Sequence, residues 1–362
     1  MATTKLLITV TGGTGFAGAH SVAAIVARGH RVRLLARDPA SAGPALEPLG
    51  VDPGAVEVVA GDVTDEAAVA AAVRGADAVL HAAAVYSFDS RQRAVMRAVN
   101  ERGTEVVLGA SRRAGVGRVV HVSSVAALFP STVDLGPDSP VGRPRETYMA
   151  TKAAAEVVAR RHQADGVPVV ISYPPAMLGP HDPKWSPPAT TQLGDQNARL
   201  RNVLRGLMPF WPRGGLPMGD VRDTAELHAI ALDSPGPNRV FGPGHAVSTR
   251  DYVAAVRAVT GRALPALFLP PAALVPVGRL ADLAQRAWPW RIPAEYGAIY
   301  ACACDARVDP AAPSAGLSPR PLAATLTDTV RWLHRTGQLS DRQAGVLGTP
   351  VPIPLLAGRA VR

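Results

Sequence analysis

Three residues of this 362-residue sequence have the types and spacing of a proton-transfer site: Ser124, Tyr148 and Lys152. Tyr148 and Lys152 are four residues apart in a helical pattern, so their side chains would share one face of that helix. A tyrosine phenol, with an unperturbed pKa of about 10, is a poor acid or base at neutral pH. A neighbouring ammonium stabilises the phenolate and lowers this pKa, and a strand-end serine can hold a substrate oxygen by a hydrogen bond. The three residues therefore predict acid–base chemistry at an oxygen atom.

A glycine-rich turn lies near the amino terminus, between an apolar strand-like run and a helical pattern. The order of strand, glycine turn and helix in residues 6–28 is the arrangement that a dinucleotide-binding site requires. Gly12 would permit the tight turn, Gly15 would let the backbone approach a pyrophosphate, and Gly18 would let the helix pack on the strand. The pyrophosphate would then bind free N–H groups at the positive end of the helix dipole. The cofactor contacts predicted in this turn are Gly12, Thr14, Gly15, Phe16 and Gly18.

The end of the second strand-like run indicates which dinucleotide fits. About 20 residues past the glycines, where an acidic side chain would bind the ribose hydroxyls, the sequence has Ala36, followed by Arg37. A carboxylate would repel a 2′-phosphate, whereas a guanidinium binds one through paired hydrogen bonds. We therefore favour NADP(H), with Arg37 and the nearby Arg33 on the same side. The alternative is NAD(H), with Arg37 in solvent and Asp38 supplying the ribose contact.

Two further strand ends supply acidic or small residues where a cofactor would pass. Asp62 and Val63 follow the third strand, and Asp62 could accept a hydrogen bond from the adenine amine or form an Asx turn or helix cap. Ala82, Ala83 and Ala84 follow the fourth strand and are small enough for close approach. We expect these five residues to line the cofactor site.

The elements that must position these residues form an alternating pattern. Strand-like runs lie at Leu6–Val10, Val32–Ala36, Val56–Ala60, Ala78–Ala82, Arg118–Ser123 and Val169–Tyr173. Helical patterns lie at Ala19–Arg28, Glu66–Arg74, Arg91–Ala114 and Tyr148–Asp165. Strands without polar alternation, each followed by a helix, indicate a parallel sheet covered on both faces. The predicted fold class is α/β, a doubly wound Rossmann sheet with its ligand at the carboxyl ends of the strands.

The second half of the chain is less periodic and predicts a smaller lobe. We assign residues 1–173 to the dinucleotide-binding domain, which 219–244 would rejoin, 174–218 and 245–340 to a substrate-binding lobe, and 341–362 to a Pro/Gly-rich tail. Elements expected there are helices at Asp220–Leu232, Ser248–Thr260, Leu280–Ala287 and Leu322–Thr336, and a strand at Asn238–Phe241.

The composition argues against several other classes of protein. The formal net charge is +9, but the arginines are scattered and no base-stacking pattern of aromatics accompanies them, so nucleic acid is not an expected partner. Cys302 and Cys304 are too close and too few for a disulfide framework or a metal site, which favours a reducing compartment. The sequence has no leader pattern, and its apolar stretch at 264–277 is broken by prolines and too short to span a bilayer. We expect a cytoplasmic protein without stable membrane insertion.

The chain resembles the extended short-chain dehydrogenase/reductase superfamily, which includes dihydroflavonol reductases, 3β-hydroxysteroid dehydrogenases and nucleotide-sugar epimerases and dehydratases. The resemblance covers residues 5–340 and rests on Thr11–Gly18, Gly61–Val63, His81–Ala84, Val99-Asn100 with Gly103-Thr104, Val122–Ser124, Tyr148–Lys152, Pro174–Pro180 and Val221–Asp223. It implies that Tyr148 donates or accepts the proton, that Lys152 tunes Tyr148 and binds the ribose, and that Ser124 orients the carbonyl.

The same resemblance implies three further contacts and a mode of assembly. Asn100 would shape the site next to the cofactor, with an ordinary helix residue as the alternative, and Pro174 and Pro175 would line the nicotinamide pocket. A homodimer through paired helices is common in the family.

Two departures from the pattern of nucleotide-sugar members shift the expected substrate. Many such members carry Arg just before the sixth-strand proline, where this chain has Tyr173, and they keep the acidic ribose-binding residue that is absent here. Both departures favour an apolar carbonyl compound. Apolar or aromatic surface for it is offered by Tyr86, Phe88, Met177, Trp185, Phe210 and Trp211. Candidates for binding a substrate diphosphate instead are Arg199, Arg201 and Arg205.

We therefore expect an NADP(H)-dependent reductase or dehydrogenase of a ketone, aldehyde or secondary alcohol, with a small molecule as its partner. Substrates similar to dihydroflavonols, steroids or small aldehydes would fit. One alternative is a nucleotide-sugar epimerase or dehydratase, in which the cofactor is regenerated in each cycle. Another is a cofactor-binding sensor without catalysis, but such relatives usually lose the Tyr or the Lys, and this chain keeps both.

Overall fold

The structure, a computed structural model, describes residues 5–183, 195–285 and 296–348. Its main feature is a seven-stranded parallel sheet, which confirms the predicted fold class. The strand order is β10-β6-β5-β4-β1-β2-β3. The strands are β1 (Leu7–Thr11), β2 (Arg31–Ala36), β3 (Glu57–Ala60), β4 (Ala78–His81), β5 (Arg118–Val122), β6 (Val169–Tyr173) and β10 (Arg239–Phe241).

Helices cover both faces of this sheet, which explains the unbroken apolar character of its strands. Ile8 and Val10 of β1 pack in one cluster with α1 and α8, while Thr9 points to the other face and donates to the Ala72 carbonyl of α3 at 2.8 Å. One face carries α1 (Phe16–Ala27), α2 (Ala42–Leu46) and α8 (Val221–Asp233). The other carries α3 (Glu66–Val73), α5 (Gly103–Arg113) and α6 (Thr147–Ala164).

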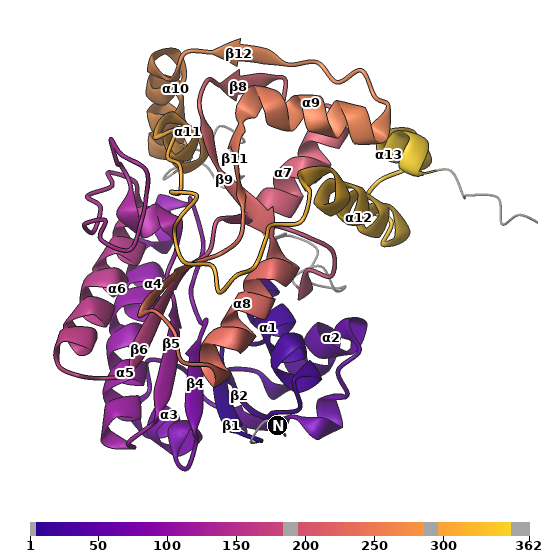
Figure 1. Cartoon of the computed structure of the whole chain (residues 1–362). Helices are drawn as coiled ribbons and strands as arrows, with labels where there is room; N and C mark the ends of the chain where they lie inside the picture. Colours follow the sequence, from indigo (N-terminus) through magenta and orange to yellow (C-terminus); the bar gives the residue numbers. More distant parts are fainter. Residues whose placement is uncertain (1–4, 184–194, 286–295, 349–362) are drawn as a thin grey trace, which may run out of the picture.

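A smaller lobe lies above the carboxyl ends of the strands in Figure 1. Its three-stranded sheet has the order β11-β9-β7, and β12 pairs with β8. The strands are β7 (Ala176–Leu178), β8 (Phe210–Pro212), β9 (Gly215–Asp220), β11 (His245–Ser248) and β12 (Leu267–Leu269). The helices are α7 (Asp195–Leu204), α9 (Thr249–Thr260), α10 (Pro271–Gln285), α11 (Tyr296–Ala303), α12 (Leu322–Arg335) and α13 (Asp341–Ala344). Leu200, Val256 and Leu333 are fully buried in the core that these elements share.

Short helical segments complete the chain. The predicted helix over 91–114 is divided into α4 (Arg93–Met96), a π-helical segment η5 (Arg97–Arg102) and α5. The 3-10 helices are η1 (Pro39–Ser41), η2 (Glu47–Leu49), η3 (Pro53–Ala55), η4 (Ser90–Gln92), η6 (Val125–Leu128) and η8 (Gly345–Leu347). No helix within the described ranges is long and apolar enough to cross a membrane.

Two segments of the second half differ from the sequence prediction. The helix expected over Leu280–Ala287 begins at Pro271 instead, and Ala287 lies outside the described residues. Proline at the first helical position is compatible with a helix, and the exposed Pro276 follows one turn later, where water can bind the carbonyl that it leaves unpaired. The start of the expected tail is also ordered: α13 has a capping box between Ser340 and Gln343, and Ala344 is fully buried. Residues 349–362 lie outside the described part.

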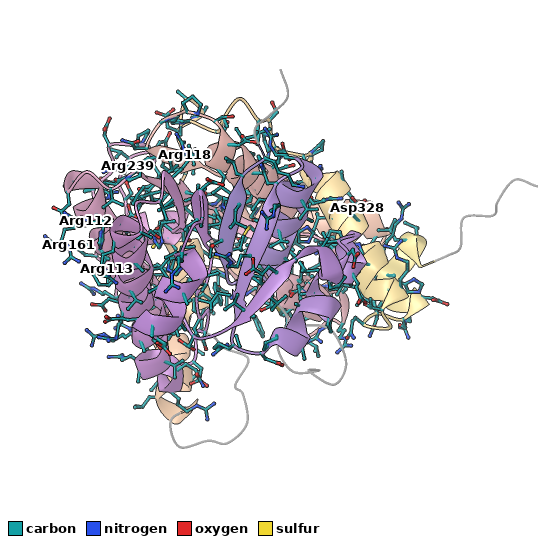
Figure 2. The ribbon with its side chains drawn as sticks, turned by 90° about the horizontal axis from the view of Figure 1, so that it is seen from below. Arg112, Arg113, Arg118, Arg161, Arg239 and Asp328 are labelled. Atoms are coloured by element: carbon teal, nitrogen blue, oxygen red, sulfur yellow. The ribbon has the colours of Figure 1, made fainter. Side chains whose placement is uncertain are left out.

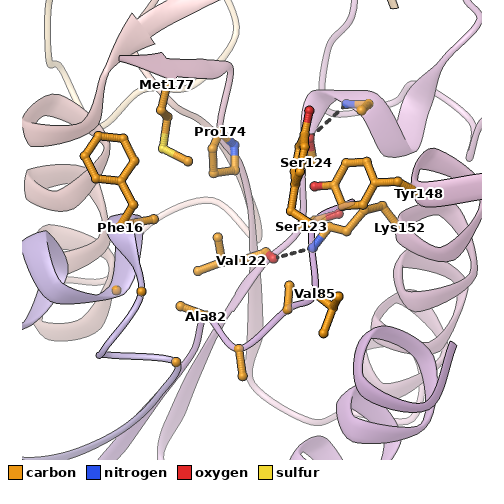
Figure 3. A pocket seen from close by; sticks show the side chains of 18 of the residues that line it. Phe16, Ala82, Val85, Val122, Ser123, Ser124, Tyr148, Lys152, Pro174 and Met177 are labelled. Carbon is orange, nitrogen blue, oxygen red and sulfur yellow. Dashed lines mark hydrogen bonds between the residues drawn. The ribbon is translucent and has the colours of Figure 1, made fainter. Parts of the chain in front are cut away.

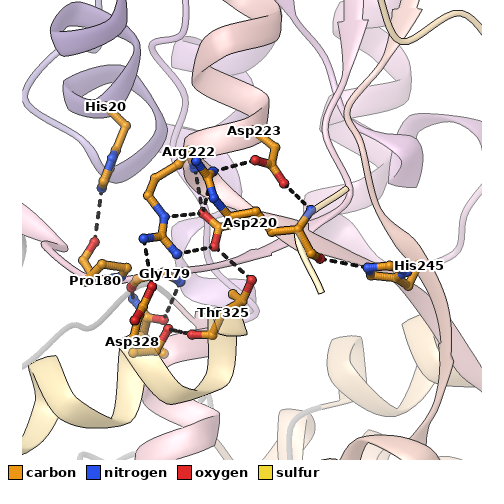
Figure 4. Close-up of polar contacts among 12 residues, drawn as sticks. His20, Gly179, Pro180, Asp220, Arg222, Asp223, His245, Thr325 and Asp328 are labelled. Carbon is orange, nitrogen blue, oxygen red and sulfur yellow. Dashed lines mark hydrogen bonds and ion pairs between the residues drawn. The ribbon is translucent and has the colours of Figure 1, made fainter. Parts of the chain in front are cut away.

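A polar network fixes the smaller lobe to the Rossmann sheet (Figure 4). Arg222 at the start of α8 binds both oxygens of the buried Asp220 at 2.8 and 2.6 Å, and also Asp328 of α12 at 2.9 Å. The backbone N–H of Arg320 donates to Asp223 at 2.7 Å. Charge-assisted, paired contacts of this kind are stronger and more directional than neutral hydrogen bonds. They therefore hold the lobe over the carboxyl edge of the sheet.

Three of the arginines labelled in Figure 2, where the molecule is seen from below, have the following local partners. Arg112 lies 3.7 Å from Asp165, and Arg161 pairs with Glu105. Arg118 donates to the carbonyls of Ala231 and Ser234 at 3.1 and 2.8 Å. Exposed pairs of this kind contribute about 0–1 kcal/mol each, so they serve solubility and local geometry more than stability.

Candidate active site

A cavity of about 480 Å³ lies at the carboxyl ends of the strands and reaches into the smaller lobe. Ser124, Tyr148 and Lys152 line it, and Figure 3 shows them across the cavity from Phe16 and Met177. Of the predicted cofactor residues outside that trio, the lining includes Gly12, Thr14, Gly15, Phe16, Gly18, Arg37, Asp62, Val63, Ala82, Ala83, Ala84 and Pro175. The topology thus brings residues that are as far apart in the sequence as Gly12 and Pro175 to one cavity.

The glycine turn has the shape that a dinucleotide needs. Gly12 has a φ of +74°, and a Cβ there would lie 2.5 Å from the Ala83 nitrogen. A Cβ at Gly18 would clash with the Gly12 carbonyl, so these two positions require glycine for packing. Gly15 precedes α1, whose first turn has neither a side-chain cap nor an acidic residue. The uncapped N–H groups therefore face the cavity and fit a pyrophosphate.

Arg37 is a basic residue at the end of the cavity where the adenosine of a dinucleotide is expected. It lines the wall beside Ala36 and Asp62. Asp38, the alternative ribose ligand, instead caps η1 by accepting the Ala40 N–H at 3.0 Å and lies outside the lining. The expectation that Arg33 faces the same way is wrong, because its guanidinium binds Glu57 at 2.9 Å and the carbonyls at the end of α3.

Asp62 forms the Asx turn that was one of its two predicted roles, and it also lines the cavity. Its Oδ1 accepts both the N–H and the O–H of Thr64, at 2.8 and 2.7 Å, so it forms an Asx turn. It also lines the cavity next to Val63. Burial opposes its ionisation, but the hydrogen bonds from Thr64 and the charge of Arg37 outweigh burial and hold the pKa of Asp62 below its usual value. A charged Asp62 can still accept an adenine N–H.

Tyr148 and Lys152 lie one turn apart at the start of α6. The carboxylate of Glu146 caps this helix by accepting the N–H groups of Tyr148 and Met149 at 3.0 and 2.8 Å. Lys152 is buried, and its Nζ donates to the Val122 carbonyl at 2.9 Å. Burial lowers the pKa of Lys152 to about 8, although the charge of Glu156 acts in the opposite direction. Lys152 is therefore still mostly an ammonium at neutral pH.

Ser124 is held at the end of β5 by the turn that follows it. Its Oγ accepts the Ala126 N–H at 3.1 Å and caps η6. Because that contact uses Oγ as an acceptor, the hydroxyl proton remains available for an oxygen in the cavity.

Glu156 is a buried carboxylate next to the site that the sequence analysis did not identify. Glu156 is 0 % exposed, and it accepts hydrogen bonds from Ser123 at 2.7 Å, Tyr173 at 2.6 Å and Arg160 at 2.7 Å. It follows Lys152 by four residues, as Lys152 follows Tyr148. That repeated spacing was the signal for a continuous polar stripe on one helix face.

Neither Asn100, which was expected to contact the cofactor, nor Tyr173 is part of the described cavity lining. Asn100 is buried in the π-helical segment and lies outside the cavity lining. Its amide binds the backbone N–H and carbonyl of Val85, at 2.7 and 3.0 Å, and donates to Thr151 at 3.0 Å, so it positions a wall residue instead of touching the cavity. Tyr173 also lies away from the cavity, stacked on Phe241 with 4.7 Å between ring centroids. The missing arginine at this position therefore says less about the substrate than its sequence context suggested.

The end of the cavity in the smaller lobe is formed mainly by apolar side chains, together with Gln196 and Arg199. The Tyr148 ring packs against Tyr86 and Phe88, with centroids 4.3 and 6.2 Å apart. The other residues at this end are Phe129, Met177, Gln196, Arg199, Leu216, Pro217 and Ala301. Among the other expected contacts, Trp211 is buried in the lobe core, Phe210 is exposed, and Trp185 lies outside the described residues.

Comparison with known proteins places the chain in a family. Residues 8–242 match the model of the NAD dependent epimerase/dehydratase family. The chain is 30% identical over 343 residues to sterol demethylase protein B of Methylococcus capsulatus, covering 91% of this chain and 99% of that protein. It is 33% identical to a putative dihydroflavonol 4-reductase of Synechocystis over 61% of this chain and 62% of that protein.

A solved structure agrees with this assignment. The crystal structure of gox2253 superposes with a TM-score of 0.72 at 27% identity, covering 92% of this chain and 99% of that one. The chain therefore belongs to the NAD dependent epimerase/dehydratase family and is an NAD(P)-dependent enzyme of the extended short-chain dehydrogenase/reductase group.

Proposed function

We propose that this enzyme is an NADP(H)-dependent oxidoreductase that interconverts a ketone or aldehyde with the corresponding alcohol. The observation that carries the proposal is that Tyr148, Lys152 and Ser124 line the same cavity as the glycine turn. An acid–base pair thus lies beside the place where a dinucleotide would lie. The names of the relatives, a sterol demethylase protein and a putative dihydroflavonol 4-reductase, support a sterol- or dihydroflavonol-like substrate.

The roles of the three residues follow from their contacts. When bound, the nicotinamide supplies a hydride to the carbonyl carbon or accepts one from the alcohol carbon. The Tyr148 hydroxyl donates its proton to the carbonyl oxygen, while the Ser124 hydroxyl donates a hydrogen bond to the same oxygen. The ammonium of Lys152, one helical turn away and buried, stabilises the phenolate that remains on Tyr148. Oxidation of the alcohol uses the reverse transfers.

The preference for NADP(H) rests on the adenosine end of the cavity. Arg37 lines the wall, and Asp38, which would repel a 2′-phosphate, is engaged in capping η1. A guanidinium can bind a phosphate through two parallel hydrogen bonds, which a ribose hydroxyl cannot exploit to the same degree. Arg37 therefore favours the phosphorylated cofactor.

The test is nicotinamide absorbance over time, with purified protein, NADPH or NADH, and a panel of sterol-like ketones, dihydroflavonols, aldehydes and nucleotide sugars. Net consumption of NADPH with an apolar carbonyl compound is the expected result. Conversion of a nucleotide sugar without net change in the cofactor would contradict the proposal and support an epimerase or dehydratase instead.

A further inference from the structure

The solvent-facing side of α10 is apolar, which is the reverse of the usual arrangement in a surface helix. Eight of residues 271–284 are exposed, and all of these except Arg279 are apolar: Ala272, Ala273, Pro276, Val277, Leu280, Leu283 and Ala284. At 3.6 residues per turn, these positions share one half of the helix surface. The carboxylate of the helix, Asp282, is on the other half, close enough to the buried Glu146 to raise its pKa, together with burial, to about 6.

The inward half of α10 is already packed, so the exposed apolar side chains are not needed for the core. Gly278 is buried, and a Cβ there would lie 3.0 Å from both Ile299 and Tyr296 of α11. On the outward half, Val277, Leu280 and Leu283 are 52, 67 and 59 % exposed, so no described segment covers them. A surface helix normally turns its apolar side to the core and its charged side to water. Apolar side chains gathered on an exposed face instead mark a binding surface.

A row of arginine and tyrosine side chains lies beside this apolar half. The Arg279 guanidinium carbon is 5.5 Å from the centroid of the Tyr296 ring. Tyr296 is followed one turn later by Tyr300, with 5.8 Å between ring centroids, and the Tyr300 hydroxyl accepts the backbone N–H of Arg145 at 3.4 Å. Arg279 and Arg145 are exposed, and neither forms an ion pair within the described ranges. The row therefore carries positive charge that no neighbouring carboxylate neutralises.

The apolar half of α10 lies one helix away from the substrate end of the cavity. Figure 1 shows α10 beside α11 at the top of the smaller lobe. On its other side, α11 contributes Ala301 to the cavity lining, and its Gly297 lies directly against the ring of Phe88, which also lines the cavity. A body bound to α10 would thus lie next to the part of the enzyme that takes the substrate.

We propose that the outward half of α10 and the adjoining Arg279–Tyr296–Tyr300–Arg145 row dock this enzyme reversibly on an anionic phospholipid surface. Apolar side chains would enter the head-group region, while arginine and tyrosine bind at its polar boundary. The formal net charge of +9 favours the same surface. A helix of 15 residues is about 22 Å long and apolar on one half, so it would lie along the bilayer and not cross it.

A phospholipid surface fits these features better than a second copy of the chain does. A second copy would bring the same unpaired arginines into the contact, where their charges repel. The proposal goes beyond the proposed function and does not depend on it, because docking requires no reaction. If the substrate is apolar, as proposed above, docking would bring the cavity next to the bilayer in which such a compound dissolves.

The experiment measures binding of the full chain to phospholipid vesicles by sedimentation. One set of vesicles is phosphatidylcholine alone, and the other is an equal mixture of phosphatidylcholine and phosphatidylglycerol. We expect the unmodified protein to bind the mixed vesicles at least about tenfold more tightly than the neutral ones, because each arginine near an anionic surface adds to the attraction. Raising the salt concentration should weaken this binding.

Matched variants separate the apolar contribution from the charge. Leu280→Ser combined with Leu283→Ser should lower binding more than about tenfold, because two leucines no longer leave water. Val157→Ser is the control, since Val157 is 56 % exposed but lies on α6. Arg279→Gln should lower binding to the mixed vesicles about fivefold, and Arg279→Lys should retain most of it. Arg113→Gln should change it less than about twofold, because Arg113 is at the end of α5 in the Rossmann domain (Figure 2).

Each other outcome would overturn the proposal. Equal binding to neutral and mixed vesicles, or unchanged binding by the double serine variant, would exclude docking through this face. If Arg113→Gln weakened binding as much as Arg279→Gln, the attraction would belong to the net charge and not to α10. A dimer in light scattering that the double serine variant loses, without vesicle binding by the unmodified protein, would make the face a contact between copies. Titration with NADPH shows that each variant is folded.

Discussion

The two ends of the cavity are built in different ways. At the cofactor end, the wall consists of backbone and small side chains at the carboxyl ends of β1 to β4, such as Gly15 and Ala83. At the substrate end, large side chains come from separate elements: Phe88 follows β4, Met177 lies on β7, Arg199 on α7 and Ala301 on α11. The cofactor end is formed by consecutive strands, turns and helices, whereas the substrate end is formed where the smaller lobe packs on the Rossmann sheet.

This difference explains what each end can specify. A dinucleotide is recognised by N–H groups and close backbone approach, which a local sequence motif can encode. A substrate is recognised by the shape and charge of side chains, which depend on how distant segments pack. The cofactor end should therefore tolerate changes at the substrate end, and the reverse should also hold.

Tyr148 lies between the two ends of the cavity, and its substitution gives the largest predicted effect on activity. Tyr148→Phe removes the hydroxyl that we propose transfers the proton but keeps the ring that packs on Tyr86 and Phe88. We expect kcat/KM to fall by about 10²–10⁴-fold, the usual contribution of a positioned acid or base. Steady-state rates measure this loss, and fluorescence titration with NADPH should give a Kd within about twofold of the unmodified value. A similar loss of cofactor affinity would mean that the two ends are not separable.

Arg37 tests the cofactor end alone. Arg37→Ala should weaken NADPH by about 10- to 100-fold, because a hydrogen-bonded charge contributes roughly 1.5–3 kcal/mol, and should leave NADH nearly unchanged. Titration of both cofactors gives the ratio. Arg33→Ala is the matched control, since Arg33 lies on β2, the strand that Arg37 follows, but binds Glu57. If Arg37→Ala weakened the binding of NADPH and NADH equally, the proposed contact between Arg37 and the 2′-phosphate would be contradicted.

The sequence predicts those parts of the molecule whose structure depends on residues that are close together in the chain. The parallel sheet follows from runs such as residues 118–122, in which Val119 and Val120 pack on opposite faces of the sheet, and the fold class was confirmed. The glycine turn could be assigned because Gly12 and Gly18 are positions where any Cβ would clash. In both cases a residue's neighbours in sequence are also its neighbours in space.

The rest depends on contacts between distant segments. Asn100 was expected at the cofactor, but its partners Val85 and Thr151 are 15 and 51 residues away, and they turn its amide away from the cavity. The choice between Arg199 and Arg205 also required the fold, because both are arginines in one polar segment. No periodicity in the sequence distinguishes such residues.

Gly297 tests the substrate end without adding charge. A Cβ at this position of α11 would overlap the Phe88 ring, which already packs against Tyr148. Gly297→Ala should displace that ring at a cost of about 1–3 kcal/mol, typical of overpacking, and raise the substrate KM about tenfold. The KM comes from substrate titration of the panel reaction. NADPH affinity should not change, and Gly136→Ala, which has open space at its Cβ, is the control. A loss of NADPH binding in Gly297→Ala would contradict the separation of the two ends.

The smallest predicted effect is that of Glu156, which lies outside the cavity lining and acts on the pKa of Lys152. Burial lowers the pKa of Lys152 to about 8 and Glu156 raises it, so the ammonium depends partly on that carboxylate. The proposed mechanism needs the charged form of Lys152, and kcat/KM should therefore fall as the pH rises past about 8. Glu156→Gln keeps the size of the side chain but removes its charge, which lets the pKa of Lys152 fall further. The alkaline limb of the pH profile should then move to lower pH, with a loss of about two- to fivefold at neutral pH.

The control for Glu156 is a variant that keeps the charge but loses a hydrogen bond. Tyr173→Phe removes the donor that lies 2.6 Å from Glu156 Oε1 without neutralising the carboxylate. If the charge is what supports Lys152, this variant keeps the alkaline limb where it is, even if it lowers stability. If both variants move the limb equally, Glu156 acts by holding β5, β6 and α6 together, and the electrostatic role is wrong. The same profile would then show that the proton-transfer residues depend on core packing, as the substrate end does, and not on a local motif.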